Sequence, residues 1–450
     1  MISSEYSDTI VALASGGGTA AVALIRLSGP QAEAIADLAC AGTASRAEER
    51  RATRAKVRDA AGRTIDDVLL TVFRGSRSFT GEPVVEIACH GGRLVTRRAL
   101  DRLLECGARS AGPGEFTERA FLNGKLDLTQ AEAVMDLISA TSDLALRAAH
   151  EQLEGGIGRR TAQLREDLIG LVAHLEAWID FPEEDIDPDT GEIFRSRIAA
   201  VQAGIAALLA TADQGRILRE GVRTVIVGRP NAGKSSLLNL LLGSERAIVS
   251  DEAGTTRDTI EEMIVLDGVP LRLVDTAGLR TEAGGIEREG MRRTLLEAER
   301  ANLVLVVRDA TLAPAESEIE LPAGPARVVT VLNKSDLGVD SGWAGKTGVK
   351  ISCTTSDGLD SLRAAIRDAL DLGEADWGEH AVAINTRHRD CLRRATASLA
   401  AADTLLNEGQ APELAAMELR ESLEALGEIA GKVDAEEVLG AIFSRFCIGK

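Results

Sequence analysis

The chain has 450 residues, 45% of them hydrophobic and 27% charged, a globular balance with enough apolar material for two to four domains of ~100–200 residues each. Its formal net charge of −19 excludes tight non-specific binding to nucleic acid, which depends on clustered Lys and Arg, so any RNA is expected to be held weakly or by a basic partner. Six scattered cysteines, no apolar run of ~18–20 residues and no signal peptide exclude a disulfide scaffold and a membrane span, and we expect a cytoplasmic protein without membrane contact.

Four sections follow one another along the chain. Residues 1–117 combine β-like runs with Gly-rich turns, and residues 118–216 are helical, with Leu, Ile and Ala at three- and four-residue steps. Residues 217–373 alternate strands and helices, and residues 374–450 are helical again. We therefore predict a multi-domain α/β protein in which an α+β N-terminal domain precedes an all-α domain that is split by an inserted α/β domain. The clearest strands of the first section are Asp8–Leu13, Val22–Leu27, Val68–Phe73 and Val84–Ala88, and an acidic, proline-containing loop interrupts the helical section at Asp180–Gly191.

The first nucleotide-binding motif follows the apolar run Val222–Val227. It reads GRPNAGKS over residues 228–235, which is GxxxxGK[ST] between an expected strand and an expected helix. Backbone N–H groups of such a loop bind phosphate, Lys234 reaches the β- and γ-phosphates, and the Ser235 hydroxyl is expected to ligate Mg²⁺. The predicted contacts of this loop are Asn231, Ala232, Gly233, Lys234, Ser235 and Ser236.

Two further segments complete the phosphate site. In GTTRD, residues 254–258, Thr256 is expected to close over the γ-phosphate and to complete the Mg²⁺ shell. After the expected strand Leu271–Val274 comes DTAG, in which Asp275 is placed to hold Mg²⁺ through water and Gly278 lets the backbone approach the γ-phosphate. The predicted nucleotide contacts of these two segments are Thr255, Thr256, Asp275, Thr276, Ala277 and Gly278, and Ser250, which precedes GTTRD, is predicted as a further contact.

Base selection is expected from NKSD, residues 333–336, directly after the apolar run Val328–Leu332. The Asp336 carboxylate can accept hydrogen bonds from guanine N1–H and from the exocyclic amine, a pair that adenine cannot supply, so GTP should be preferred to ATP. Ser352, in SCT after a further strand, would add a backbone contact to the guanine oxygen. Asn333, Lys334, Asp336 and Ser352 are therefore the predicted base-binding residues, and the ordered motifs predict a Ras-like P-loop G domain that hydrolyses GTP.

The attacking water needs a different partner from the one in Ras-like proteins, where a Gln follows the Asp-x-x-Gly motif. Leu279 occupies that position here and has no polar group to offer. Glu282, Glu287 and Glu289 are the nearby candidates, and the alternative is that all three only solvate an exposed helix.

Longer segments carry a resemblance that spans nearly the whole chain. Together with the GTPase motifs, SFTGEPVVEIACHGG (78–92), GEFTERAFLNGKLDLTQAEAV (114–134), IDFPEEDI (179–186) and the terminal CIGK (447–450) resemble the bacterial tRNA-modification GTPases of the MnmE (TrmE) family. The resemblance implies a folate-binding N-terminal domain that forms a constitutive homodimer, a split helical domain and an inserted G domain. It also implies a heterotetramer or larger assembly with the flavoprotein MnmG (GidA), which brings FAD. The pair would add an aminomethyl or carboxymethylaminomethyl group to carbon 5 of the wobble uridine of certain tRNAs, with a folate as one-carbon donor.

By the same resemblance, Arg26, Glu86, Lys125 and Lys450 fall on positions that bind 5-formyl- or methylene-tetrahydrofolate. The glutamate tail of folate suits cations and its pterin ring suits a carboxylate, whereas the sequence alone makes Arg26 and Glu86 ordinary surface charges. Cys447 falls on a functionally important cysteine of the family, and the alternative for it is a small buried hydrophobe.

The resemblance further implies that K⁺ takes the place of an arginine finger when two G domains meet across the dimer. The matching positions are Asn231 and the backbone around Ser250, Glu252 and Thr255. A fixed cation near the transferring phosphoryl oxygens stabilises the charge that develops there. Among the three candidate glutamates, the match to the family selects Glu287 as the catalytic, water-positioning residue.

The chain departs from the family at Ser15–Ala21, where SGGGTAA replaces a Pro-Pro-Gly-Arg-Gly-Gly stretch, and at Phe79, where a Tyr is also found. Alternatives remain. A ribosome-assembly type of GTPase would carry an RNA-binding domain with a basic face, which this composition lacks. A folate-dependent one-carbon transferase with an incidental NTPase insert leaves the guanine motifs unexplained, and a non-catalytic switch is disfavoured because each Mg²⁺-ligating residue type is present.

Overall fold

The computed structural model describes residues 7–180, 192–244, 262–274, 296–321, 326–370, 384–408, 412–431, 436–444 and 446–449. The chain divides into two compact units. The first unit comprises residues 1–135, 152–202 and 391–450, and the second comprises residues 136–151 and 203–390. Each unit contains a six-stranded sheet.

The sheet of the first unit is antiparallel except at one edge, where β1 and β6 run parallel. Its order is β3-β4-β5-β2-β1-β6. The four strands expected from the sequence are confirmed. Strand β3 was not predicted, because only two of its six side chains are buried and charged residues flank both of them. The strands are β1 (Ile10–Leu13), β2 (Val22–Ser28), β3 (Thr53–Arg58), β4 (Thr64–Phe73), β5 (Val84–His90) and β6 (Arg109–Ser110), and the helices of this part are α1 (Ala32–Cys40) and α2 (Arg93–Glu105).

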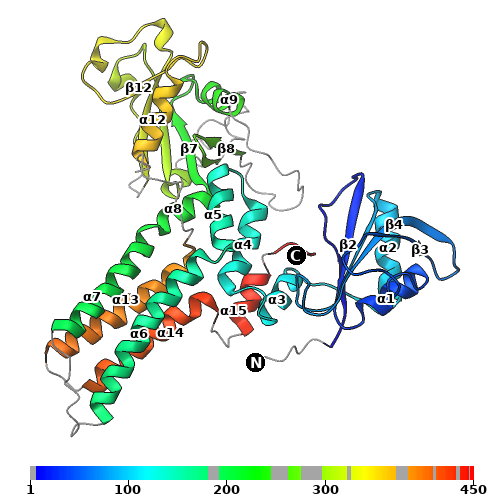
Figure 1. Cartoon of the computed structure of the whole chain (residues 1–450). Helices are drawn as coiled ribbons and strands as arrows, with labels where there is room; N and C mark the ends of the chain where they lie inside the picture. The colour runs from blue at the N-terminus through cyan, green and yellow to red at the C-terminus, as the bar shows by residue number, and fades with distance from the viewer. Residues whose placement is uncertain are drawn as a thin grey trace. The chain divides into compact units, whose positions relative to one another are not determined.

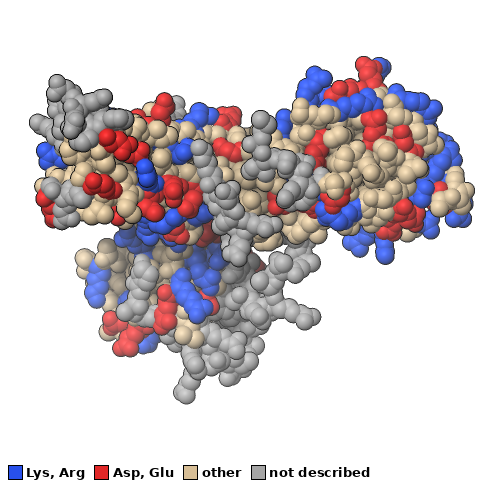
Figure 2. Space-filling model, turned by 90° about the horizontal axis from the view of Figure 1, so that it is seen from below, with Lys and Arg blue, Asp and Glu red and all other residues tan. Residues whose placement is uncertain are grey.

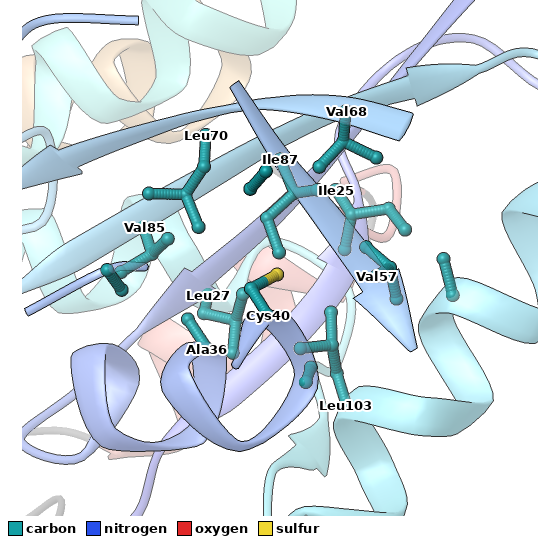
Figure 3. Packing of buried hydrophobic residues seen from close by; sticks show 14 of the residues in the cluster. Ile25, Leu27, Ala36, Cys40, Val57, Val68, Leu70, Val85, Ile87 and Leu103 are labelled. Atoms are coloured by element: carbon teal, nitrogen blue, oxygen red, sulfur yellow. The ribbon is translucent and has the colours of Figure 1, made fainter. Parts of the chain in front are cut away.

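Alternation along the strands of this sheet builds its main core. On β2, Ile25 and Leu27 point to the face that α1 and α2 cover, and Ile87 of β5 and Leu70 of β4 point the same way (Figure 3). Burying each such side chain contributes about 1.5–3 kcal/mol. Arg26, between Ile25 and Leu27, therefore faces the opposite side of the sheet, which keeps that face available for polar chemistry.

The helical part of the first unit brings together segments that are far apart in the sequence. Figure 1 shows α6 alongside α14, and Arg420 Nε donates to Glu176 Oε1 between them at 2.7 Å. Helices from before and after the second unit's sheet therefore pack on each other. The helices of this region and of the connections are α3 (Glu115–Leu122), α4 (Leu128–Ser139), α5 (Asp143–Leu153), α6 (Gly156–Asp180), α7 (Glu192–Ala210), α8 (Ala212–Glu220), α13 (Thr386–Asn407), α14 (Pro412–Ala430) and α15 (Glu436–Phe443).

One stretch of the described chain, Ile193–Glu220, is long and apolar enough to cross a membrane by length and composition. Apolar helices in the cores of proteins that never meet a membrane pass the same test, so this stretch does not assign a span.

The sheet of the second unit is parallel apart from the β8–β9 hairpin, and its order is β12-β11-β10-β7-β9-β8. Strand β7 is apolar on both faces: Ile226 belongs to one hydrophobic cluster and Val225 to another. Such two-sided burial is typical of a central parallel strand with helices on both sides. The elements are β7 (Val222–Gly228), α9 (Lys234–Ser244), β8 (Glu262–Leu266), β9 (Val269–Leu273), β10 (Leu303–Asp309), β11 (Arg327–Asn333), β12 (Val349–Lys350), α12 (Leu359–Ala369) and the short 3₁₀ turns Pro314–Ser317, Ser335–Leu337 and Ser341–Trp343.

The excess of acidic residues is not gathered into one area on the face that Figure 2 shows. Basic and acidic side chains alternate across the described residues of that face.

Candidate nucleotide-binding site

The phosphate-binding loop runs from the end of β7 to the start of α9, as the motif predicts. Two of its residues have backbone angles in the left-handed region, Asn231 with φ 61° and Gly233 with φ 99°. A Cβ at Gly228 would lie 2.6 Å from the carbonyl oxygen of Val307, so the loop leaves β7 tightly against β10. Glycine is therefore required at positions 228 and 233 for steric reasons, whereas Asn231 adopts the left-handed conformation as a non-glycine residue.

Asn333 connects the phosphate-binding loop to the base-binding loops. Its Nδ2 donates to the carbonyl oxygen of Ala232 at 3.0 Å, and its Oδ1 accepts from the N–H of Cys353 at 3.2 Å. A Cβ at Gly233 would lie 2.0 Å from the same Nδ2. The side chain of Asn333 is thus a brace between three loops rather than a free ligand.

A cleft of about 300 Å³ lies over these loops. Most of the described phosphate-side and base-side residues that the sequence predicts line it together, although they come from motifs about a hundred residues apart. The residues that line the cleft are Asn231, Gly233, Ser235, Ser236, Asn333, Lys334, Asp336, Leu337, Cys353 and Thr354.

Ser352 is buried and is not among the residues that line the cleft. Its N–H donates to the carbonyl oxygen of Asp357 at 3.0 Å, and its hydroxyl accepts from the N–H of Thr355 at 3.2 Å. Cys353 and Thr354 are the members of this motif that reach the cleft. Burial raises the pKa of the Cys353 thiol to about 11, with a smaller contribution from Asp336, so a neutral thiol lines the base end.

Two lysines of the motifs have different partners. Lys234 Nζ donates to the carbonyl oxygen of Arg229, within the phosphate-binding loop, at 3.0 Å. Lys334 Nζ donates to Asp309 Oδ2 at 2.6 Å, at the carboxyl end of β10. Sequence reasoning missed Asp309. The signal that could have found it is an Asp that ends an apolar run directly before the run leading to NKSD.

Several predicted site residues lie outside the described residues, and the structure places none of them. They are Ser250, Glu252, Thr255, Thr256, Asp275, Thr276, Ala277, Gly278, Glu287 and Lys450.

The first unit holds a second group of predicted residues. Arg26 and Glu86 face each other across β2 and β5, and Arg26 donates to Glu86 Oε1 from Nε at 3.0 Å and from Nη2 at 2.8 Å. The Arg26 guanidinium also lies 5.5 Å from the ring centroid of Phe79 and 5.9 Å from that of Phe116. These residues thus form a half-buried ion pair between aromatic rings rather than two separate surface charges.

Lys125 and the end of the chain lie in the same unit as this pair. Lys125 Nζ donates to the carbonyl oxygen of Ser76 at 3.0 Å, in the loop before β5. Ile448 forms a β-bridge with Pro113, and a Cβ at Gly449 would lie 2.1 Å from the carbonyl oxygen of Leu13. Cys447 is exposed, so the interpretation of it as a buried small hydrophobe is wrong.

The parallel sheet, the glycine-rich phosphate loop and the guanine-type base motif together define a P-loop GTPase, an enzyme that hydrolyses GTP.

Comparison with known proteins narrows this class. A family described as "MnmE helical domain" matches residues 128–447, and one described as "GTP-binding protein TrmE N-terminus" matches residues 9–125. The chain therefore belongs to the MnmE (TrmE) family.

Individual relatives agree along the whole length. The tRNA modification GTPase MnmE of Akkermansia muciniphila is 50% identical over 444 residues, covering 98% of this chain and 99% of the relative. That of Xanthomonas campestris pv. campestris (strain B100) is 47% identical over 448 residues, with 98% and 99% covered. A solved structure of the G domain of the FeoB iron transporter of T. maritima is 25% identical, with a TM-score of 0.24, and covers 33% of this chain and 98% of its own.

Proposed function

We propose that this chain is a K⁺-dependent GTPase that, with the flavoprotein MnmG, adds an aminomethyl or carboxymethylaminomethyl group to carbon 5 of the wobble uridine of certain tRNAs. The GTPase part of this proposal rests on one observation: Asn231 of the phosphate loop and Asp336 of the base motif line the same cleft. The relatives named tRNA modification GTPase support tRNA as the substrate. The proposal includes a cytoplasmic homodimer within a larger assembly with the flavoprotein, which supplies FAD.

The cleft has side chains that can ligate the two cations of the proposal, Mg²⁺ and K⁺. The Ser235 hydroxyl lies in it and would hold Mg²⁺ together with Thr256. Asn231 is exposed and also lines the cleft, and it would hold K⁺ together with Ser250, Glu252 and Thr255. Cations held there would supply positive charge next to the transferring phosphoryl oxygens. Asn231 has a left-handed backbone, which fixes the direction in which its amide leaves the loop.

GTP hydrolysis by the purified chain in K⁺ and in Na⁺ buffer at equal ionic strength tests the proposal. We expect stimulation by K⁺ and its loss in Asn231→Ala. Glu287→Ala should abolish hydrolysis while GDP affinity stays nearly unchanged, because a residue that only orients water contributes little to ground-state binding. Glu320→Ala, at an exposed position, is the matched control. Equal rates in both salts would exclude the K⁺ site, and normal turnover of Glu287→Ala would exclude that residue.

The first unit is proposed to bind 5-formyl- or methylene-tetrahydrofolate through Arg26, Glu86, Lys125 and Lys450. The Glu86 carboxylate is held by the Arg26 guanidinium, which lies beside two aromatic rings, and this arrangement suits a flat heterocycle that donates hydrogen bonds. Calorimetric titration with 5-formyltetrahydrofolate should show binding that Glu86→Gln weakens and the exposed Glu105→Gln does not. Equal affinities of the two variants would contradict the assignment.

The proposed domain boundaries are residues 1–117, 118–216, 217–373 and 374–450, with the G domain as an insertion into the helical domain. The packing of α6 on α14 supports the insertion, because the two helices flank residues 217–373 in the sequence. A fragment of residues 217–373 should therefore fold and bind GDP by itself, and an unfolded fragment by circular dichroism would count against these limits.

A further inference from the structure

The carboxyl edge of the parallel sheet holds an ion pair that the motifs do not describe. Asp309 is the last residue of β10 and stands opposite Asn333 in the β10–β11 register. Lys334 follows Asn333, and its Nζ lies 2.6 Å from Asp309 Oδ2. The Asp309 side chain is 13% exposed and that of Lys334 is 32% exposed, so the pair is partly shielded from water.

The Asp309 carboxylate is held in one orientation. Its Oδ1 accepts from the N–H of Thr311 at 3.0 Å and from the Thr311 hydroxyl at 2.6 Å, while Oδ2 takes the lysine. Burial alone would raise the pKa of Asp309, but the hydrogen bonds from Lys334 and Thr311 hold it below its usual range. The Asp309 carboxylate is therefore charged at neutral pH and keeps its ion pair with the Lys334 ammonium group.

Lys334 is also constrained at its backbone and lines the nucleotide cleft. Its φ is 65°, in the left-handed region, and it lies between Asn333 and Asp336 on the cleft wall. Because the Lys334 ammonium group is bound to Asp309, the methylene stem is the part of this side chain that can contact a ligand in the cleft. Lys234, at the other side, bonds within the phosphate-binding loop.

We propose that Asp309 is a positioning residue for the guanine nucleotide. By holding the ammonium group of Lys334, it fixes the methylene stem as an apolar platform on which the base and ribose lie, next to the Asp336 carboxylate that selects the base. This inference rests on the proposed function only in that the cleft binds a guanine nucleotide, and it is independent of tRNA, folate and K⁺.

The first test is the dissociation constant for GDP, measured by titration calorimetry on the full chain. Asp309→Asn should weaken GDP about 10-fold, because the lysine loses its anchor and the platform becomes mobile. The kcat for GTP at saturation should stay within about twofold, so that the loss appears in KM. Asp340→Asn is the matched control, since Asp340 Oδ1 accepts from the N–H of Gly342 at 2.8 Å in the same group of loops. It should change GDP affinity less than about twofold.

A double-mutant cycle separates positioning from a merely structural role. Lys334→Met keeps the stem and removes the ammonium group, so Asp309→Asn should change GDP affinity less than about twofold in that background. Asp309→Glu keeps the charge and should restore affinity to within about threefold of the wild type, and it also serves if Asp309→Asn does not fold. Equal weakening in both backgrounds, or an unchanged affinity of Asp309→Asn, would overturn the inference. A wild-type chain that binds no GDP would instead overturn the proposed function and this inference together.

Discussion

At the scale of single residues, we expect Asp336 to decide which base the cleft accepts. It lies on the cleft wall, next to the neutral thiol of Cys353, and its carboxylate can only accept hydrogen bonds. Guanine offers two donors on one edge, whereas xanthine presents an oxygen where guanine has its amine. Asp336→Asn should therefore weaken GTP by roughly 100-fold or more and improve XTP.

This change of specificity is measured by letting GTP or XTP compete with a fluorescent guanine nucleotide for binding to the cleft. Asp340→Asn provides the control, because the Asp340 carboxylate caps a turn and does not line the cleft. An Asp336→Asn variant that loses both nucleotides equally would mean that the residue holds the loop together instead of selecting the base.

A second residue-scale feature is the buried Arg119 of the first unit. The side chain is 0% exposed and donates to Asp8 Oδ1 at 2.7 Å and to Glu115 Oε1 at 2.9 Å, while Glu82 Oε2 lies 3.3 Å from Nη1. Burial alone would raise the pKa of Glu115, but hydrogen bonds from Arg109, from the N–H of Gly112 and from Arg119 hold it below its usual range. The same guanidinium groups lower the pKa of Asp8 against its own desolvation.

These lowered pKa values determine whether the stability of the folded chain rises or falls in acid. A carboxyl group whose folded pKa is depressed contributes stability that is complete above its unfolded pKa, about 4.3 for Glu, and that is lost as pH falls through the folded value. The free energy of unfolding of the chain should therefore decline below about pH 4.5. Glu115→Gln should be less stable than the wild type at pH 7 and should show a shallower decline.

Denaturant unfolding followed from pH 7 to pH 3 by circular dichroism checks this dependence. Glu105→Gln is the control because Glu105 is largely exposed in a surface pair with Arg102. Parallel curves for the wild type and Glu115→Gln would show that Glu115 does not carry the acid response.

At the scale of elements, the strand–loop–helix unit of β7 and α9 depends on the absence of a side chain at Gly233. Its φ of 99° strains any other residue, and a Cβ would lie 2.0 Å from Asn333 Nδ2. Gly233→Ala should then lose the bond from Asn333 to Ala232, lower the free energy of unfolding by about 1–3 kcal/mol and abolish GDP binding.

The matched variant is Gly243→Ala, at the other end of α9, where nothing lies within 4 Å of the added Cβ. Because alanine favours a helix, this change should keep GDP binding and raise stability by up to about 1 kcal/mol. Thermal melts with and without GDP compare the two. Retention of the GDP-induced shift by Gly233→Ala would show that the loop can rearrange around a methyl group.

The elements also show what the sequence could predict. Strands β7 and β11 are apolar and carry motifs at their carboxyl ends, so their positions and part of the cleft followed from pattern alone. Strand β3 exposes Arg54 and Lys56 and buries only Ala55 and Val57, and such short alternation is indistinguishable from a polar loop. The pairing of Asp309 with Lys334 depends on strand register, and the Arg119 network depends on contacts over about a hundred residues, so neither could be predicted from a local pattern.

At the scale of the whole molecule, we propose a cycle in which the two G domains of a homodimer approach each other when K⁺ and GTP are bound and separate after hydrolysis. A label on α12 can report this motion, since Asp360 in its first turn is 96% exposed on its side chain. Among the six free cysteines, Cys447 is the exposed one, whereas the others are buried or half-buried. Asp360→Cys in a background without the exposed Cys447 and the cleft-lining Cys353 therefore gives a spin label at a defined place.

Distances between the two labels in the dimer, measured by electron–electron double resonance, should shorten from GDP to GDP with aluminium fluoride in K⁺. The shortening should be absent in Na⁺ and in Asn231→Ala, because the cation supplies the charge that holds the closed state against the repulsion of two acidic chains. A single distance distribution under all these conditions would contradict the cycle and leave hydrolysis within separate G domains. A shortening that is the same in K⁺ and Na⁺ would keep the approach of the domains and remove the cation as its cause.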